Sequence, residues 1–387
     1  MKRNEFLVTT SGMVTAAMLS GFGWMETETD AASRANGARR RPDPASFHEP
    51  ILQVLAIGLN APNPHNTQAW KFKMISPTET LFYVDETRLL TATDPIARQI
   101  HIGCGCFIAL FEIGAGALGY AAAVEYLPEG NYDYADIGKK PLARLSLQKG
   151  APTRDELYPH IFNRQTNRSL YHGAVTDEAF QSILAQAKPA HAQVHLTNDP
   201  RALKPMLILL YQGMEVECYD WDAFDESRRW FRVKDDIAAK RDGLNMRVSG
   251  LRGGPMLWLS ETLLRNYSKS VWHNEGAIEG LLKSHYDKVM SSKGVVTFIT
   301  ATNTLIDWIR CGQDYARFQL AAQGQGFFMH PLSQVLQEYP AMKKCYNAFN
   351  DLMAVREPAK IQMAVRIGRA RPLEYSYRRN PNDLLIK

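Results

Sequence analysis

One short stretch of this 387-residue chain gathers side chains that could bind a flat polar ligand. Residues 61–70 read Ala-Pro-Asn-Pro-His-Asn-Thr-Gln-Ala-Trp, and two prolines restrict the backbone on either side of Asn63. His65, Asn66 and Gln68 donate and accept hydrogen bonds without fixed charge, which suits a heteroaromatic ring with carbonyls and ring nitrogens. The same residues are typical of an ordinary turn, so the spacing alone leaves both interpretations open.

Polar and basic side chains also gather between residues 164 and 168. Arg164 and Arg168 bracket the hydroxyl of Thr166 and the amide of Asn167. Guanidinium groups bind phosphate through two parallel hydrogen bonds, so the segment could hold a phosphorylated ligand. A solvated loop of the same composition is the alternative that the sequence leaves open.

Helices and strands are both predicted around these segments. An apolar helix over 47–59 leads into the 61–70 turn, and residues 71–75 follow the turn as a strand. Gly and Ala recur along the buried helix predicted for 94–120, which lets another helix approach closely. No glycine-rich phosphate loop is present, so neither a Rossmann nor a P-loop fold is supported. Further strands are predicted for residues 81–84, 124–126 and 142–147.

The order of helix and strand recurs further along the chain. Residues 51–74 resemble residues 183–196, and the segment starting at Ile102-Gly103 can be aligned with the one starting at Cys311-Gly312. A repeat of this length predicts two fused copies of one domain, with chance similarity as the alternative. We therefore expect an α+β fold in which two divergent copies form a pseudo-dimer within one chain, with a central mixed sheet flanked by helices.

The predicted domain boundaries follow from this repeat. The first copy is expected to span residues 46–150, and the second residues 151–387. Residues 211–300 interrupt the second copy and are rich in aromatic and charged side chains, so we interpret them as a helical insertion that covers part of the molecule. Ordinary domain helices with one core face are the alternative for any part of this insertion.

Charge and cysteine content narrow the functional classes. The net charge is +5 and the basic residues are dispersed, so we expect no nucleic-acid partner. Five cysteines, an odd number, disfavour a disulfide framework. Cys104 and Cys106 are too close together for the usual structural zinc pattern, and we interpret them as small core residues, with a redox pair as the alternative. No second ligand pair accompanies His273 and Glu275, so no metal site is predicted.

Residues 1–45 are interpreted as a targeting segment and linker rather than part of the fold. Basic residues precede an apolar stretch at residues 6–24, and small residues follow as candidate cleavage points. The stretch is short and weakly apolar for a bilayer span, so contact with a membrane is expected only through the export machinery. Residues 3–7 resemble a twin-arginine export signal with Asn4 in place of the second arginine. This predicts a periplasmic protein, or a cytoplasmic one if the signal does not function.

Four segments, in consistent order, resemble the flavin-dependent nitroreductase family. The 61–70 turn is similar to the family signature Ala-Pro-Ser-x-x-Asn-x-Gln-Pro-Trp, with Asn63 in place of serine and Ala69 in place of the second proline. Residues 164–168 resemble its Arg-x-Ser-x-Arg/Lys segment. Residues 320–331 resemble its Ala-x-x-x-Gly-Leu segment, and residues 365–369 its closing strand. The resemblance covers roughly residues 47–385.

This resemblance implies that the chain binds FMN, and it assigns roles to the residues of the 164–168 segment. Arg164 and Thr166 would hold the phosphate and ribityl chain, with Asn167 beside them. Arg168 would lie near N1 and O2 of the flavin, where a cation stabilises the reduced ring, and is the one residue expected to act catalytically.

The other three segments would complete the cofactor site. Arg366 and Arg369 on the closing strand would add to the phosphate grip. Backbone N–H groups of the glycine-containing segment would point at flavin N5, and polar side chains of the turn would contact the ring. The residues of the glycine-containing segment are Gln323, Gly324, Gln325 and Gly326. The residues of the turn are Asn63, His65, Asn66 and Gln68.

In this family the flavin lies between two subunits that both contribute to it. Here the turn is in the first copy and the other three segments are in the second, so the resemblance implies one FMN per chain, a monomer with an internal pseudo-two-fold axis, and a lid over the flavin. The implied activity is an FMN-dependent oxidoreductase that passes electrons from a donor such as NAD(P)H to a small nitroaromatic or quinone-like acceptor. The alternatives are an FMN-sequestering protein whose lid blocks turnover, and a structural relative that has lost flavin.

Overall fold

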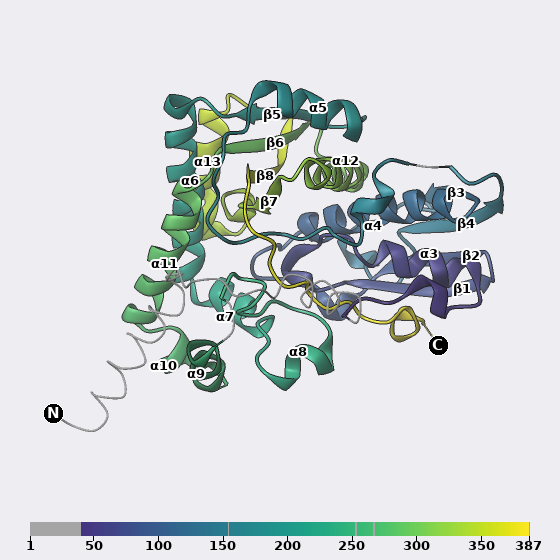
Figure 1. Ribbon diagram of the computed structural model, residues 1–387, viewed down its shortest axis with the longest axis horizontal. Coiled ribbons are helices and arrows are strands. Elements are labelled where there is room, and N and C mark those ends of the chain that lie inside the picture. The colour runs from purple at the N-terminus through teal and green to yellow at the C-terminus, as the bar shows by residue number, and fades with distance from the viewer. Residues whose placement is uncertain (1–39, 154, 252–253, 266–267, 387) are drawn as a thin grey trace.

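The computed structural model describes residues 40–153, 155–251, 254–265 and 268–386 (Figure 1). The described strands form two sheets of four strands each, and helices pack on both. The predicted export signal falls on residues 1–39, outside the described part, and stays a prediction. Residues 40–45 were expected as a linker but dock onto the fold, since the buried guanidinium of Arg41 donates to the carbonyls of Phe162 and Arg164 at 3.0 and 2.9 Å.

The first half builds one sheet and two helices. Helix α3 (Pro50–Gly58) has a proline in its first turn, where the missing N–H needs no partner. Helix α4 (Arg98–Ala117) is apolar and long enough to cross a membrane, but 89% of its apolar window is buried inside the protein. The sheet order is β1-β2-β4-β3, with every neighbouring pair antiparallel. Its strands are β1 (Trp70–Ser76), β2 (Glu79–Val84), β3 (Tyr120–Tyr126) and β4 (Ala143–Lys149).

The second half repeats this arrangement. Helix α5 (Asp177–Ala187) precedes the sheet, and helix α12 (Leu305–Gly324) begins with a capping box between Thr304 and Asp307. Helix α13 (Lys343–Leu352) is inserted before the last strand. The sheet order is β5-β6-β8-β7, again antiparallel throughout. The strands are β5 (Gln193–Thr197), β6 (Gly294–Thr300), β7 (Phe328–Pro331) and β8 (Lys360–Gly368).

The two sheets have the same topology when their strands are numbered within each half. The α+β class is confirmed, and the matching strand orders fit two copies of one unit. The single central mixed sheet is wrong: each copy has its own antiparallel sheet. Each half thus satisfies the backbone hydrogen bonds of its own strands within its own antiparallel ladder, without a shared sheet.

Helices α4 and α12 join the two copies by crossing at two glycines. A Cβ on Gly105 would lie 1.8 Å from the carbonyl oxygen of Ile309, and a Cβ on Gly312 would lie 2.0 Å from that of Ile102. Each glycine follows its isoleucine by three residues, so the two contacts are exchanged by a two-fold operation, as in a symmetric dimer interface. Gly312 is therefore equivalent to Gly105, and the alignment of Gly312 with Gly103 was displaced by two residues.

A long helical segment separates β5 from β6, and we call residues 200–290 the cover. In Figure 1 the middle helices of the cover lie below the second sheet, and its last helix runs beside its first one. The predicted insertion at 211–300 falls largely on the cover, but its last residues form strand β6. The cover contains α6 (Pro200–Tyr219), α7 (Trp221–Arg229), α8 (Asp235–Lys240), α9 (Pro255–Leu264), α10 (Lys269–Trp272) and α11 (Glu275–Met290).

The C-terminal tail, residues 370–386, returns from the second copy to the first (Figure 1). The N–H of Ile386 donates to the carbonyl of Phe72 on β1 at 2.8 Å, and Leu385 forms a parallel bridge with Phe72. The tail thus extends the edge of the first sheet with residues from the end of the chain. This contact and the α4–α12 crossing fix the two copies against each other.

Candidate functional site

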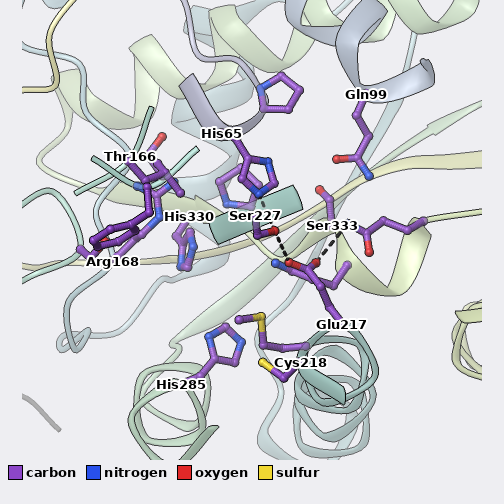
Figure 2. A pocket seen from close by; sticks show the side chains of 18 of the residues that line it. His65, Gln99, Thr166, Arg168, Glu217, Cys218, Ser227, His285, His330 and Ser333 are labelled. Atoms are coloured by element: carbon purple, nitrogen blue, oxygen red, sulfur yellow. Dashed lines mark hydrogen bonds between the residues drawn. The ribbon is translucent and has the colours of Figure 1, made fainter. Parts of the chain in front are cut away.

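A cavity of about 330 Å³ lies where the two copies and the cover meet. The first copy contributes the 62–65 turn and one face of α4, and the second contributes residues from the 166–168 segment, α12 and β7. Figure 2 shows Thr166, Arg168 and His330 on one side of this cavity and Gln99 and Ser333 on the other. The remaining wall is mainly apolar and includes Pro62, Pro64, Ile102, Phe224, Phe231, Leu244, Met246, Trp272 and Met363.

The turn that borders the cavity has a constrained backbone. His65, Asn66 and Gln68 have φ values of 48°, 54° and 49°, in the left-handed region that costs non-glycine residues energy. Asn63 stabilises this shape, because its Oδ1 accepts from the N–H of Gln68 at 2.8 Å and its Nδ2 donates to the carbonyl of Ala61. The conformation points the His65 ring into the cavity and turns the next polar side chains away from it.

Asn66 and Gln68 hold the cover and the tail in place. The Asn66 amide donates to the carbonyl of Gly243 at 3.1 Å and accepts from Arg378 at 2.7 Å. Gln68 donates to the carbonyl of Arg241 at 2.9 Å, and its Oε1 accepts from the N–H of Arg379. These contacts occupy the polar atoms of both amides, and neither residue lines the cavity, so the predicted contact of the two amides with the cofactor stays a prediction.

Buried ion pairs add to the attachment of the cover. Asp242 accepts from Arg88 at 2.8 Å and from Arg232 at 2.7 Å, so one carboxylate joins the first copy to two points of the cover. Glu226 on α7 accepts from the N–H groups of Ala92 and Thr93. The cover is thus closed over the cavity in this structure by contacts that are independent of any ligand.

Positive charge gathers on one side of the cavity without a carboxylate to balance it. The guanidinium of Arg168 makes no hydrogen bond or ion pair with any described residue, and Lys288 reaches only the carbonyl of Ser249, at 3.3 Å. Burial lowers the pKa of Arg168 to about 10, and burial together with Arg366 and Arg168 lowers the pKa of Lys288 to about 8. Burial and the same cations hold the pKa of His330 well below its usual value. This side of the cavity therefore favours an anion.

Arg164 lies outside the cavity and donates hydrogen bonds elsewhere. Its Nε donates to the carbonyl of Asn60 at 3.0 Å and its Nη1 to Oε1 of Gln319 at 3.2 Å. Arg378 donates to the neighbouring carbonyls of Leu59 and Ala61. These three carbonyls directly follow α3, which ends at Gly58, so the two buried cations lie near the negative end of its dipole and stabilise it. Arg164 thus has a structural role in this structure, and its predicted phosphate role stays a prediction.

Arg366, Asn167 and Arg369 also differ from their predicted roles. Arg366 is buried behind the cavity, where it donates to the carbonyls of Lys288 and Ser169 and to Nδ1 of the cavity residue His330. The Asn167 amide donates to the carbonyl of Arg371 at 2.8 Å. Arg369 is exposed and donates to the carbonyl of Gln325. None of the three lines the cavity, although Arg366 acts on it through its charge.

The glycine-containing segment lies at the far end of α12 from the cavity. Gly324 is the last residue of α12, and a Cβ there would lie 2.6 Å from the ring of His160. Gln325 donates to Ser182 on α5, and Gly326 has a φ of 77°. The segment ends a helix, packs against α5 and the 158–162 loop, and does not line the cavity. The predicted contact of Gln323, Gly324, Gln325 and Gly326 with flavin stays a prediction.

Four of the predicted cofactor residues do line the cavity: Asn63, His65, Thr166 and Arg168. The structure adds side chains to which no motif in the sequence assigned a role. Lys288 and His285 come from α11, Glu217 and Ser227 from α6 and α7, and His330 from β7. No sequence motif marks the cavity residues that the cover contributes. The one signal in the sequence was that the insertion contains polar and charged side chains among its aromatic ones.

Comparison with known proteins finds local sequence relatives. No family model matches the chain. A Mycobacterium tuberculosis protein described as "Putative NAD(P)H nitroreductase acg" is 33% identical over 90 residues, which are 23% of this chain and 27% of that protein. A second protein of that organism, "Putative NAD(P)H nitroreductase Rv3131", is 30% identical over 112 residues, 27% of this chain and 32% of that protein. The match thus spans about a third or less of each relative.

Solved structures of nitroreductase-like proteins align with part of this chain. The nitroreductase-like family protein from Bacillus cereus aligns with 60% of this chain and 94% of its own, with 13% identity and a TM-score of 0.34. The FMN-dependent nitroreductase NfnB from Mycobacterium smegmatis, in complex with NADPH, aligns with 55% of this chain and 86% of its own, with 14% identity and a TM-score of 0.32. At these scores the likeness supports no conclusion about function. Over about a quarter of its length, the chain is related in sequence to nitroreductase-like proteins.

Proposed function

We propose that this chain is an FMN-dependent oxidoreductase of the nitroreductase type, which takes electrons from a reduced donor such as NAD(P)H and passes them to a small nitroaromatic or quinone-like acceptor. The local relatives named as NAD(P)H nitroreductases support the reaction class. The proposed ligand site is the cavity between the two copies, so one chain would suffice for one site without a partner subunit.

The observation that carries the proposal is the unpaired guanidinium of Arg168 inside a largely apolar cavity. A charge held away from water is costly unless an opposite charge or hydrogen-bond acceptors balance it. Within the described part of the chain Arg168 has neither, and Lys288 beside it has only one long contact. An anionic ligand with a large aromatic surface, as FMN is, satisfies both the charge and the apolar wall.

The residues that line the cavity fit FMN in chemistry. The proposed site for its anionic part differs from the one that the family resemblance implies. Arg168, Lys288 and the hydroxyl of Thr166 would hold the anionic part, while Asn63 and His65 supply polar contacts across the cavity. The volume of about 330 Å³ lies at the lower end of ligand pockets, which occupy roughly 300–1,000 Å³. Bound FMN would supply hydride transfer at N5, and the surrounding residues would orient it and exclude water.

Lys288 makes the binding of FMN depend on pH. Its pKa is lowered to about 8, so the ammonium is present near neutral pH and is lost as the pH rises through that value. The phosphate of FMN is already doubly ionised above neutral pH, since such groups have a second pKa of about 6. We therefore expect the affinity for FMN to fall between neutral pH and about pH 9, measured by quenching of FMN fluorescence.

The variant Lys288→Met is the control for this pH dependence. It keeps the length of the side chain and removes the ionisable group, so its affinity for FMN should be weaker near neutral pH and nearly independent of pH in that range. An equally steep pH dependence in this variant would show that another group is responsible.

The proposed function is tested by the visible spectrum and flavin content of the purified chain. About one FMN per chain, released on denaturation, is expected, together with NAD(P)H-dependent reduction of a quinone. Two FMN per chain would contradict a single site between the copies. Absence of flavin after incubation with excess FMN would refute the proposed cofactor, and bound flavin without turnover would refute the proposed activity.

A further inference from the structure

A chain of hydrogen bonds connects the turn of the first copy to the cover along the cavity wall. Nε2 of His65 lies 2.9 Å from Oγ of Ser227, and Ser227 Oγ lies 2.9 Å from Oε1 of Glu217. Gln337 donates to the other carboxylate oxygen of Glu217 at 3.1 Å. Figure 2 shows these contacts as an unbroken path beside the cavity. Three side chains from separate elements thus meet at hydrogen-bonding distance.

Glu217 is the one carboxyl group among the described residues that line the cavity. Its side chain is buried, and burial raises its pKa to about 7, against the lowering effect of its bonds to Ser227 and Gln337. Glu226 on α7 also raises this pKa through its charge. The other titratable groups that face Glu217 are His65 from the turn, Tyr339 from the second copy and the adjacent Cys218. No cation pairs with Glu217 among the described residues, so it carries a proton in a substantial fraction of molecules near neutral pH.

The other end of the path opens into the cavity. His65 lines the cavity, and its second ring nitrogen, Nδ1, has no hydrogen-bond partner among the described residues. Burial and the charge of Arg168 lower the pKa of His65 to about 4, so the ring is neutral near pH 7 and carries one proton. A neutral imidazole donates from one nitrogen and accepts at the other, and a serine hydroxyl does both. A proton can therefore move along the path without charging the ring.

We propose that Glu217 is the proton donor of this cavity, and that Ser227 and His65 carry its proton to an acceptor bound there. This inference rests on the proposed oxidoreductase function and adds the source of the proton to it. A hydroquinone product needs a hydride and one proton for each quinone reduced. A donor held at hydrogen-bonding distance gives its proton at the point of transfer, which is what general acid catalysis needs.

The proton transfer balances in three concerted moves. Nδ1 of His65 gives its proton to one quinone oxygen, and the bound cofactor would supply the hydride that the quinone gains. Nε2 of His65 takes the hydroxyl proton of Ser227, and Ser227 takes the proton of Glu217. His65 ends neutral with its proton on Nε2, and Glu217 ends as a carboxylate. When the product leaves, Nδ1 takes a proton from solvent, and the Nε2 proton returns through Ser227 to Glu217, which restores the starting state.

The variant Glu217→Gln tests the proposal, since it keeps the shape and removes the proton. The flavin-loaded protein is reduced with dithionite and reoxidised in a stopped-flow instrument by either a benzoquinone or ferricyanide. Ferricyanide takes single electrons and no proton. We expect reoxidation by the quinone to slow by ~100-fold or more, in the range of general acid catalysis, and reoxidation by ferricyanide to stay unchanged. Equal slowing with both acceptors, or with neither, would overturn the proposal.

Serine variants separate the path from a purely structural role. Ser227→Ala interrupts the path and should slow the quinone reaction alone, whereas Ser227→Thr returns a hydroxyl and should restore most of the rate. Glu215→Gln, on the same helix but outside the cavity, is the matched control for loss of a carboxylate from the cover. Full activity of Ser227→Ala would exclude the path through the hydroxyl.

The pH dependence of the quinone reaction distinguishes a proton donor from a residue that only packs in the cavity wall. In the unmodified chain the quinone rate should fall as the pH rises through about 7, because Glu217 loses its proton there, and the fall should be absent in Glu217→Gln. Infrared spectra should show a protonated carboxyl band that titrates in the same range, shifts in D₂O and is lost in the variant. Absence of bound flavin would refute the proposed function itself, whereas a flavin-loaded Glu217→Gln protein with unmodified quinone kinetics would refute only the proton donor.

Discussion

Replacing Arg168 with alanine is expected to weaken binding of FMN roughly 10- to 100-fold. Hydrogen bonds to charged groups contribute about 1.5–3 kcal/mol, and each 1.4 kcal/mol corresponds to a tenfold change in affinity. Arg168 has no hydrogen bond or ion pair to lose among the described residues, so its removal should leave the stability of the fold nearly unchanged. Fluorescence titration with FMN measures the affinity, and thermal unfolding of the same samples without FMN checks the fold.

Arg369→Ala is the matched control for this experiment. The resemblance assigns both arginines to the cofactor, but Arg369 is exposed and lies outside the cavity. The variant should bind FMN with unmodified affinity. The opposite pattern, with FMN lost in Arg369→Ala and kept in Arg168→Ala, would place the anion site where the family motif has it and refute the site described above.

Replacing Gly105 with alanine is expected to destabilise the protein by ~3 kcal/mol or more. The added Cβ would lie 1.8 Å from the carbonyl oxygen of Ile309, where no flexible side chain can move aside. Overpacking usually costs about 1–3 kcal/mol, and here two backbones must separate. Because Ile102 and Gly103 of the same helix line the cavity, separation of α4 from α12 should also weaken FMN binding. Urea denaturation measures the loss of stability.

Gly312 and Gly150 provide the comparisons for this prediction. Gly312→Ala should cost nearly as much as Gly105→Ala, and the double variant should cost less than the sum, since helices that have already separated accommodate the second methyl. Gly150→Ala meets no atom closer than 3.9 Å and should be nearly neutral. Wild-type stability of Gly105→Ala would contradict the close crossing on which the internal two-fold relation depends.

The sequence was sufficient to predict most of the local structure. The apolar run before the 61–70 turn, the period-two strands and the small-residue helix at 94–120 correspond to α3, β1 to β4 and α4 within a few residues. These features follow from short-range physics, because side-chain periodicity and turn residues act within one element. The two-residue error in aligning Gly312 arose because helices rich in glycine and alanine align equally well in several registers.

The repeat of two copies was also visible in the sequence, but the arrangement of their sheets was not. Strand pairing joins residues far apart in the chain, such as Val296 with Val365, and no local pattern specifies it. The central mixed sheet was expected from the general mixture of helices and strands. In the structure each copy pairs its own strands in an antiparallel sheet, and the copies meet through α4 and α12.

By itself the sequence determined which residues of the turn and of the 164–168 segment could bind a ligand, and four of these residues line the cavity. Only the tertiary structure decided which polar groups remain unused. Arg164 and Arg168 are four residues apart and chemically identical. The first donates to the carbonyl of Asn60 and the side chain of Gln319, whereas the second donates to no described residue. The cover added Lys288, Ser227 and Glu217 for the same reason: whether a polar side chain binds a ligand depends on which backbone and side-chain partners the fold has already given it, and those partners are distant in sequence.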